Sequence, residues 1–190
     1  MIEQLIQYDT ELFIFLNGLG TETWDGFWMF YTTKFNWIPF YAILLYLMYK
    51  NYNRKSFLLI VLVVALMVAF TDQITNLFKD GFERFRPCHN EALDGIMRLV
   101  KPKCGGKYGF FSGHASNSMA VAVFVGLTLR PYYKYLIFFM LFWAAAMAYS
   151  RVYIGVHYPL DIFCGMVFGA LSGFGFYKFF GYLNKRFEFN

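Results

Sequence analysis

Long apolar runs alternate with short polar segments along most of the chain, and their lengths predict membrane-spanning helices. The clearest run covers residues 56–78 and contains the segment LLIVLVVALMVAF. A helix needs roughly 20 apolar residues to cross a bilayer, and this run is long enough. Four further runs predict spans, of which the first is the most mixed in composition: residues 27–49, 112–129, 135–149 and 159–180. The pattern therefore predicts an all-α bundle of five membrane-spanning helices.

The amino-terminal segment, residues 1–23, has a different pattern. Its apolar residues recur close to helical spacing, but Glu3, Asp9 and Glu11 interrupt them. Such an amphipathic segment is typical of a helix that lies in the membrane interface. We therefore expect an interfacial helix within residues 1–23, or a sixth span if the segment inserts. A secretory signal is not expected, because the segment has no basic n-region and no small-residue cleavage site.

The composition favours an integral membrane protein. Of the 190 residues, 58% are hydrophobic and 23% aromatic, while only 15% are charged. Neither a linker nor an internal repeat divides the chain, so residues 1–190 are expected to form one domain of unspecified oligomeric state. The net charge of +5 does not indicate nucleic acid binding, because the cations are spread over short loops. Membrane lipids are the expected partners.

The distribution of lysine and arginine predicts the orientation of the bundle. One side carries basic residues of the short loops and of the carboxyl end: Lys50, Arg54, Lys55, Arg130, Lys134, Lys178, Lys185 and Arg186. By the positive-inside rule this side faces the cytoplasm. A simple count is weakened by basic residues on the other side, where cations kept against this bias are expected to serve a site: Lys79, Arg84, Arg86, Arg98, Lys101, Lys103 and Lys107. The other side, with a loop at residues 88–110, then faces the periplasm or exterior. The sequence thus predicts a multi-pass protein of the inner (cytoplasmic) membrane.

Three charged stretches lie at ends of the predicted spans, all on the outer side. They are residues 79–87 (KDGFERFRP), residues 111–114 (FSGH) and residues 150–161 (SRVYIGVHYPLD). An arginine and a lysine such as Arg86 and Lys79 together suit an anion that has several oxygen atoms. Taken alone, this pair could equally hold lipid headgroups.

The second stretch predicts the amino terminus of a helix. Ser112 and Gly113 come directly before an apolar run, so the Ser112 side chain can cap the helix that begins there. The free N–H groups of the first turn then point outward, where they can bind an anion. A Ser-Gly pair before a helix is common, and alone it is weak evidence for a site.

The third stretch places a histidine beside a carboxylate. His157 comes just before Pro159, a residue favoured in the first helical turn, and Asp161 can accept a hydrogen bond from one ring nitrogen of His157. The other nitrogen would be free as a nucleophile, although a structural His–Asp pair is the simpler interpretation of these two residues alone. With Arg151 and His114 added, the set predicts phosphoryl transfer, in which His157 attacks phosphorus and His114 protonates the leaving oxygen.

The spacing of these residues resembles the three-part signature of the type 2 phosphatidic acid phosphatase superfamily, which is shared with the vanadium haloperoxidases. The matching parts are Lys79-x6-Arg86-Pro87, Ser112-Gly113-His114 and Ser150-Arg151-x5-His157-x3-Asp161. The resemblance implies a phosphohistidine intermediate on His157, oriented by Asp161, with His114 as general acid. It also implies that no metal or other cofactor is required and that five residues hold the phosphate: Lys79, Arg86, Ser112, Gly113 and Arg151. The chain departs from the family at Phe111, where proline is usual.

The family resemblance narrows the expected substrate to a lipid phosphate or diphosphate. Small members are similar to undecaprenyl diphosphate phosphatases, while relatives act on phosphatidylglycerol phosphate, phosphatidic acid or lipid A. The cations between Arg98 and Lys107 could hold a second phosphate, which favours undecaprenyl diphosphate, hydrolysed to undecaprenyl phosphate at the outer face of the membrane. A non-catalytic lipid carrier is the alternative from another class, but binding alone would need neither His157 nor Asp161.

Several further polar residues allow two interpretations. Cys88 and Cys104 flank the outer loop and could form a disulfide in an oxidising compartment, or remain free thiols. Together with His89 they do not have the spacing of a usual zinc site. Arg84 could contact the substrate or neutralise Glu83. Asp72, inside a predicted span, could serve a function or bond a neighbouring helix, and Cys164 is interpreted as a core residue.

Overall fold

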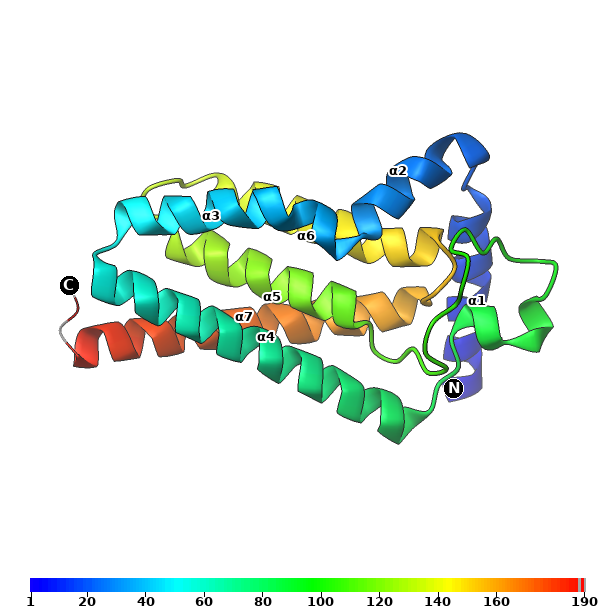
Figure 1. Cartoon of the computed structure of the whole chain (residues 1–190). Helices are drawn as coiled ribbons and strands as arrows, with labels where there is room; N and C mark the ends of the chain where they lie inside the picture. Colours follow the sequence, from blue (N-terminus) through cyan, green and yellow to red (C-terminus); the bar gives the residue numbers. More distant parts are fainter. Residues whose placement is uncertain (188, 190) are drawn as a thin grey trace.

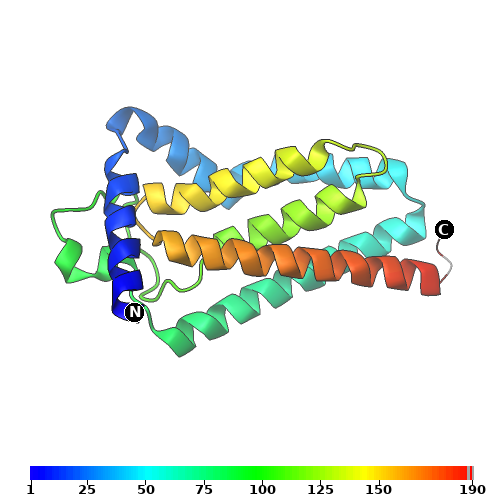
Figure 2. The same cartoon turned by 180° about the vertical axis from the view of Figure 1, so that it is seen from behind.

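The computed structural model describes residues 1–187 and 189, so two residues of the predicted domain 1–190, Glu188 and Asn190, lie outside the described residues. Within the described part the chain forms seven α-helices: α1 (Ile2–Gly18), α2 (Glu22–Thr32), α3 (Ile38–Asn51), α4 (Arg54–Phe82), α5 (Gly113–Thr128), α6 (Leu136–Tyr153) and α7 (Pro159–Arg186). Helices α3 to α7 run side by side as a bundle (Figures 1 and 2). In the same residues, extended pairing is limited to an isolated bridge between Phe85 and Tyr108. The prediction of an all-α membrane bundle is confirmed.

The helices of the bundle differ in their capacity to cross a bilayer. By length and composition, α4, α6 and α7 qualify, with 29, 18 and 28 residues. The helices α3 and α5 have 14 and 16 residues, which is shorter than the roughly 20 residues that a full span needs. The predicted span at residues 27–49 is divided into α2 and α3 by a 3₁₀ turn, η1 (Lys34–Trp37). Pro39, in the first turn of α3, is compatible with a helix that starts there and not with one that continues from α2.

Apolar side chains occupy both faces of α4. Ile60, Val63 and Met67 recur at helical spacing and are buried in the core of the bundle. Leu62 and Leu66, on the opposite face, remain 56% and 49% exposed. An apolar outer face of this kind suits contact with lipid hydrocarbon and not with water.

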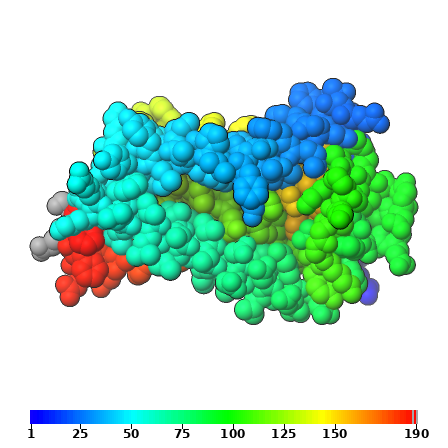
Figure 3. Space-filling view, viewed as in Figure 1, coloured from blue at the N-terminus to red at the C-terminus, as the bar shows by residue number. Residues whose placement is uncertain are grey.

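The central helix α5 packs against α4, α6 and α7. In the space-filling view part of it is visible in a furrow between α2–α3 and α4 (Figure 3). Its approach to α7 depends on Gly165, Gly169 and Gly173, which are four residues apart on one face of α7. A Cβ atom at Gly165 would lie only 2.7 Å from the carbonyl oxygen of Ser112, and one at Gly169 would overlap the carbonyl oxygen of Ser116. Small residues allow helix backbones to approach this closely, so these glycines place the start of α5 against the start of α7. This four-residue spacing of glycines is visible in the sequence and could have indicated close packing of α7.

Helix α1 runs across one end of the bundle instead of along it (Figures 1 and 2). Phe13 is fully buried in a cluster with Leu93, Val152 and Tyr158. The side chain of Asn17 accepts a hydrogen bond from the backbone N–H of Arg98 at 2.7 Å and donates to nearby carbonyl oxygens. The remaining face exposes apolar residues: Ile2, Leu5, Ile6, Leu12 and Phe15. This helix is amphipathic as expected, and its place in the membrane interface stays a prediction.

Candidate active site

Four helix ends meet at the end of the bundle that α1 crosses. The helices α4 and α6 end there, at Phe82 and Tyr153, and α5 and α7 begin there, at Gly113 and Pro159 (Figure 1). The connecting loops, residues 83–112 and 154–158, close this end of the molecule. As a result the three charged stretches lie close together, as the topology predicted.

The imidazole of His157 is buried and held by a carboxylate. Its Nδ1 lies 3.3 Å from Oδ2 of Asp161. Asp161 is completely buried and has two other donors: the backbone N–H of Tyr158 at 3.0 Å, and Nη1 of Arg84 at 2.7 Å. A carboxylate fixed from several sides holds the imidazole in one orientation. With the proton on Nδ1, the Nε2 atom keeps its lone pair.

Several surrounding charges act on the protonation of His157. Burial lowers the pKa of His157 well below the usual 6.5, and the neighbouring cations Arg151, Arg86 and Lys79 lower it further. The protonated form is thus disfavoured in the folded protein, and the imidazole is neutral near pH 7. A neutral imidazole is the form that can act as a nucleophile.

This lowered pKa predicts the acid side of the pH profile. Protonation of His157 removes the lone pair, so kcat/KM should fall only when the pH drops well below 6.5. Replacing Arg86 by glutamine removes one of the cations that lower the pKa, and the acid limb should move to higher pH, whatever the absolute rate. The measurement is kcat/KM against pH for both proteins with one substrate, so that the ionisation of the substrate cancels. An acid limb at the same pH in both proteins would contradict the assignment.

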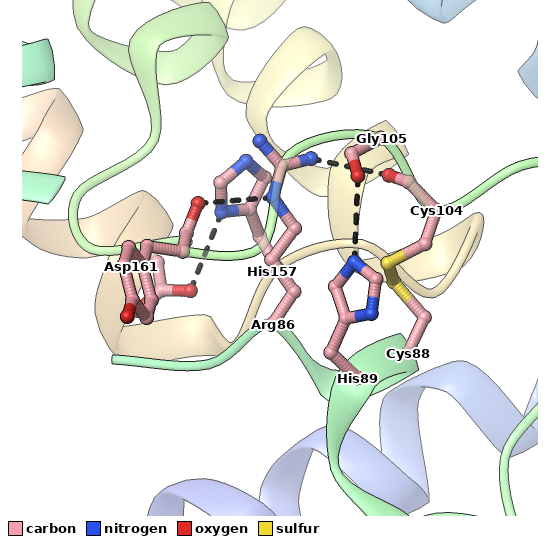
Figure 4. Close-up of a disulfide and its surroundings, with 8 residues drawn as sticks. Arg86, Cys88, His89, Cys104, Gly105, His157 and Asp161 are labelled. Atoms are coloured by element: carbon pink, nitrogen blue, oxygen red, sulfur yellow. Dashed lines mark hydrogen bonds and ion pairs between the residues drawn. A yellow bond between two sulfur atoms is a disulfide. The ribbon is translucent and has the colours of Figure 1, made fainter. Parts of the chain in front are cut away.

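Arg86 reaches the site from the loop after α4. Its Nε donates to the carbonyl oxygen of Tyr108 at 3.1 Å, and its Nη1 donates to that of Cys104 at 3.3 Å. Figure 4 shows its guanidinium between His157 and the backbone of Cys104 and Gly105. Both donations go to neutral carbonyl groups, so the charge of Arg86 remains available to an anion.

A disulfide between Cys88 and Cys104 fixes this loop (Figure 4). The Cα atoms of the two residues are 5.8 Å apart, within the usual range for a disulfide. Because each sulfur is bonded to the other, neither is available as a thiolate ligand for zinc, even though His89 lies next to Cys88. The alternative of two free thiols does not apply in this structure.

Lys79 and Arg151 approach from two helices. Lys79, in the last turn of α4, places its Nζ 3.8 Å from the position of a Cβ atom on Gly113, beside the start of α5. Arg151, in the last turn of α6, is 5% exposed and donates from Nη1 to the hydroxyl of Thr32 at 2.7 Å, while its Nε has no partner in the described part of the chain. Among residues 1–187 and 189, none of Lys79, Arg86 and Arg151 forms an ion pair with a carboxylate. Positive charge without an ion-pair partner favours a bound anion.

The start of α5 differs in one respect from the prediction. Ser112 occupies the N-cap position, but its side chain makes no capping hydrogen bond, and its buried Oγ has no partner among the described residues. The prediction of a capping side chain was therefore wrong. The backbone N–H of Ser112 is tied to the main-chain carbonyl of Asp161 at 3.0 Å, which holds the residue in place without its hydroxyl. Both that hydroxyl and the N–H groups of the first turn are left for a ligand.

His114, in the first turn of α5, is half-buried and lies within electrostatic reach of His157 and Arg151. Two lysines that the motif does not contain, Lys34 and Lys101, also act on it. Lys101 interacts with Arg86 and Arg151 as well, so at least one cation of the outer loop reaches the site. The structure thus brings all the site residues predicted from sequence to one end of the bundle.

Arg84 and Asp9 lie beside the site, and their positions could not be predicted from the sequence. Arg84 does not pair with Glu83; its guanidinium bonds Asp161 and Asp9 and lies 4.3 Å from the ring centroid of Tyr158. Asp9 was interpreted only as a polar position of the amino-terminal helix. Asp72 remains exposed on α4.

Comparison with known sequences agrees with this geometry. Residues 57–185 match the family model of the PAP2 superfamily. A protein of Bacteroides thetaiotaomicron named lipid A 4'-phosphatase is 37% identical over 179 residues, which cover 93% of this chain and 79% of that protein. A lipid A 4'-phosphatase of Porphyromonas gingivalis is 35% identical over 188 residues, with 97% and 78% covered. An undecaprenyl-diphosphatase of Sulfolobus acidocaldarius is 31% identical over 175 residues, with 90% and 78% covered.

Two solved structures share the fold. The transmembrane PAP2 type phosphatidylglycerolphosphate phosphatase from Bacillus subtilis superposes with a TM-score of 0.72 at 21% identity, covering 93% of this chain and 86% of that one. LpxE from Aquifex aeolicus gives a TM-score of 0.64 at 20% identity, covering 89% and 94%. The family match extends over more than half of the chain, and relatives above 30% identity are named phosphatases. The chain belongs to the PAP2 superfamily and is a membrane lipid phosphatase.

Proposed function

We propose that this phosphatase hydrolyses the phosphate monoester at the 4' position of lipid A. Two relatives at 37% and 35% identity are named for that reaction, whereas the relative named undecaprenyl-diphosphatase is 31% identical. Lipid A was one of the alternatives that the sequence left open. Undecaprenyl diphosphate, which the sequence argument favoured, becomes the second candidate.

The positions of the outer-loop cations support a monoester substrate over a diphosphate. Arg98, which was expected to help hold a second phosphate, pairs with Asp25 at 2.9 Å. The ammonium of Lys107 lies over the rings of Phe85 and Tyr108. Lys101 is within electrostatic reach of Arg86 and Arg151, and this contact favours the second candidate.

The chemistry that we propose proceeds in two displacements on His157. In the first, Nε2 of His157 attacks phosphorus, the bond to the lipid oxygen breaks, and His114, which the bound phosphate anion keeps protonated, gives its proton to that oxygen. In the second, His114 takes a proton from water, the water oxygen attacks phosphorus, and the phosphorus–nitrogen bond breaks. Inorganic phosphate leaves, and His157 and His114 return to their starting forms.

The observation that carries this proposal is the convergence of unpaired cations on a histidine that is oriented by a carboxylate. Lys79, Arg86 and Arg151 would bind the non-bridging oxygens, together with the Ser112 hydroxyl and the first-turn N–H groups at Gly113. Charge builds up on these oxygens during phosphoryl transfer, where fixed cations and N–H groups contribute most to the rate. A lipid carrier would not require an imidazole held at Nδ1 and free at Nε2.

The site faces the periplasm or exterior in this proposal. The disulfide between Cys88 and Cys104 supports that orientation, because disulfides persist in oxidising compartments. The basic residues at the opposite end of the bundle support it as well.

A substrate panel tests the proposed function. Purified protein in detergent, with EDTA present, would be given lipid A, undecaprenyl diphosphate, phosphatidylglycerol phosphate and phosphatidic acid in turn. We expect the highest kcat/KM with lipid A and a product that retains every phosphate except the one at the 4' position, as identified by mass spectrometry. A higher kcat/KM with undecaprenyl diphosphate would select the second candidate, and no release from any of these lipids would contradict a phosphatase acting on them.

A further inference from the structure

Helix α1 contributes an acidic residue, Asp9, to the hydrogen-bond network behind the predicted nucleophile. We propose that Asp9 is a positioning residue that acts through Arg84 on Asp161, and so on His157. The inference rests on the proposed function, since it takes His157 as the group that attacks phosphorus.

One guanidinium joins the two carboxylates. Nη2 of Arg84 lies 2.6 Å from Oδ2 of Asp9, and Nη1 of Arg84 lies 2.7 Å from Oδ1 of Asp161. The side chains of Arg84, Asp9 and Asp161 are 19%, 5% and 0% exposed. Short charge-assisted bonds in such a buried place are strong and directional. Arg84 therefore transmits the position of Asp9 to the carboxylate that holds His157.

Asp9 also fixes the backbone next to Asp161. Its Oδ1 accepts a hydrogen bond from the N–H of Leu160 at 2.7 Å, in the first turn of α7. That N–H is one of the donors that a helix leaves without a partner at its start. One turn later on α1, Phe13 packs edge to face on Tyr158, with ring centroids 5.3 Å apart. Helix α1 is thus docked on the segment that carries His157 and Asp161.

The charge balance gives Asp9 a function beyond holding α1 in place. When His157 attacks phosphorus, its ring becomes positively charged, and a negative charge at Asp161 stabilises it. Arg84 alone would cancel the charge of Asp161. With Asp9 included, two carboxylates and one guanidinium leave a net charge of about −1 behind the imidazole. Arg84, unlike Lys79 or Arg86, directs its donors at carboxylates and is not a phosphate ligand in this arrangement.

The test is an isosteric change that removes the charge. Asp9→Asn keeps an oxygen acceptor for Leu160 but no longer forms an ion pair with Arg84. We expect kcat to fall about tenfold, as for other groups that orient a reacting residue, with KM nearly unchanged. The matched control is Asp25→Asn, which breaks the Arg98–Asp25 pair at the same end of the molecule without touching Asp161, and it should leave kcat unchanged.

A double-mutant cycle separates positioning from general destabilisation. If Asp9 acts through Arg84, Asp9→Asn should cause no further loss of kcat in a protein that already carries Arg84→Gln. The same tenfold loss in both backgrounds would overturn the inference, because it would show that Asp9 acts independently of Arg84.

A second measurement needs no substrate. The chain has only three histidines, so the imidazole ¹⁵N signals of labelled protein can be assigned by substitution. Asp9→Asn should shift the signals of His157, whereas Asp25→Asn should not. If the signals shift although no lipid phosphate is hydrolysed, the positioning inference stands and the proposed function fails. If lipid A is hydrolysed but Asp9→Asn changes neither kcat nor the His157 signals, the positioning inference alone fails.

Discussion

Replacement of His157 by alanine is expected to lower kcat for lipid phosphate hydrolysis by at least about 1,000-fold. The imidazole is buried and oriented by Asp161, and its pKa is lowered, so the proposed nucleophile is neutral and aimed before substrate binds. Alanine removes the atom on which the covalent intermediate forms. Binding by Lys79, Arg86 and Arg151 should persist, so the alanine variant should still bind inorganic phosphate.

The measurement combines turnover with detection of the intermediate. Brief exposure to a labelled lipid phosphate, followed by alkaline denaturation, should leave label on the unmodified protein and none on His157→Ala, since phosphohistidine survives alkali. The matched control is His89→Ala, because His89 is an exposed histidine of the same loop region whose ring bonds the carbonyl oxygen of Gly105. It should retain full activity. More than about 1% of normal kcat in His157→Ala, or label that stays on the protein, would show that the nucleophile is another residue.

The architecture of the bundle could be predicted because it depends on patterns that repeat along the chain. Apolar runs bounded by charges gave the helices α4 to α7, and their alternating direction put the charged stretches at one end. The break between α2 and α3 was missed because aromatic residues continue across it, from Phe27 to Trp37, and hide the change of direction. Pro39 was the local signal of a new helix.

The candidate site could be predicted only where its residues belong to short motifs. His157 and Asp161 are four residues apart, and their contact follows from helical geometry. Arg84 and Asp9 are 75 residues apart in the chain, and Arg151 and Thr32 are 119 apart. Contacts across such separations depend on how α1 and α2 dock on the bundle. No periodicity distinguishes Asp9 from a solvated acid on an amphipathic helix, so its function becomes visible only when the helices are packed.

Replacement of Arg151 is expected to change activity and stability in opposite directions. Arg151 is 5% exposed, its guanidinium bonds Thr32, and among the described residues its Nε has no partner, while the charge of Arg86 acts on it. A buried charge without a counter-charge destabilises the folded protein until an anion binds. Arg151→Met keeps an unbranched side chain as far as the position of Nε and removes the charge. We therefore expect kcat/KM to fall by about 100-fold or more, while the Tm of the protein without substrate rises by about 2–4 °C.

Thermal unfolding in detergent, with and without inorganic phosphate, measures the stability side of this prediction, and hydrolysis of a lipid phosphate measures kcat/KM. Phosphate should raise the Tm of the unmodified protein, because an anion that binds only the folded state stabilises it. The Tm of Arg151→Met should respond much less. Arg98→Met is the matched control: Arg98 is paired with Asp25, so its loss leaves a carboxylate unpaired and should lower the Tm. A lower Tm for Arg151→Met as well, with an unchanged response to phosphate, would mean that Arg151 is a structural residue whose charge is already compensated. The two substitutions are expected to change the Tm in opposite directions, because Asp25 of the protein compensates the charge of Arg98, whereas the phosphate of the substrate compensates that of Arg151.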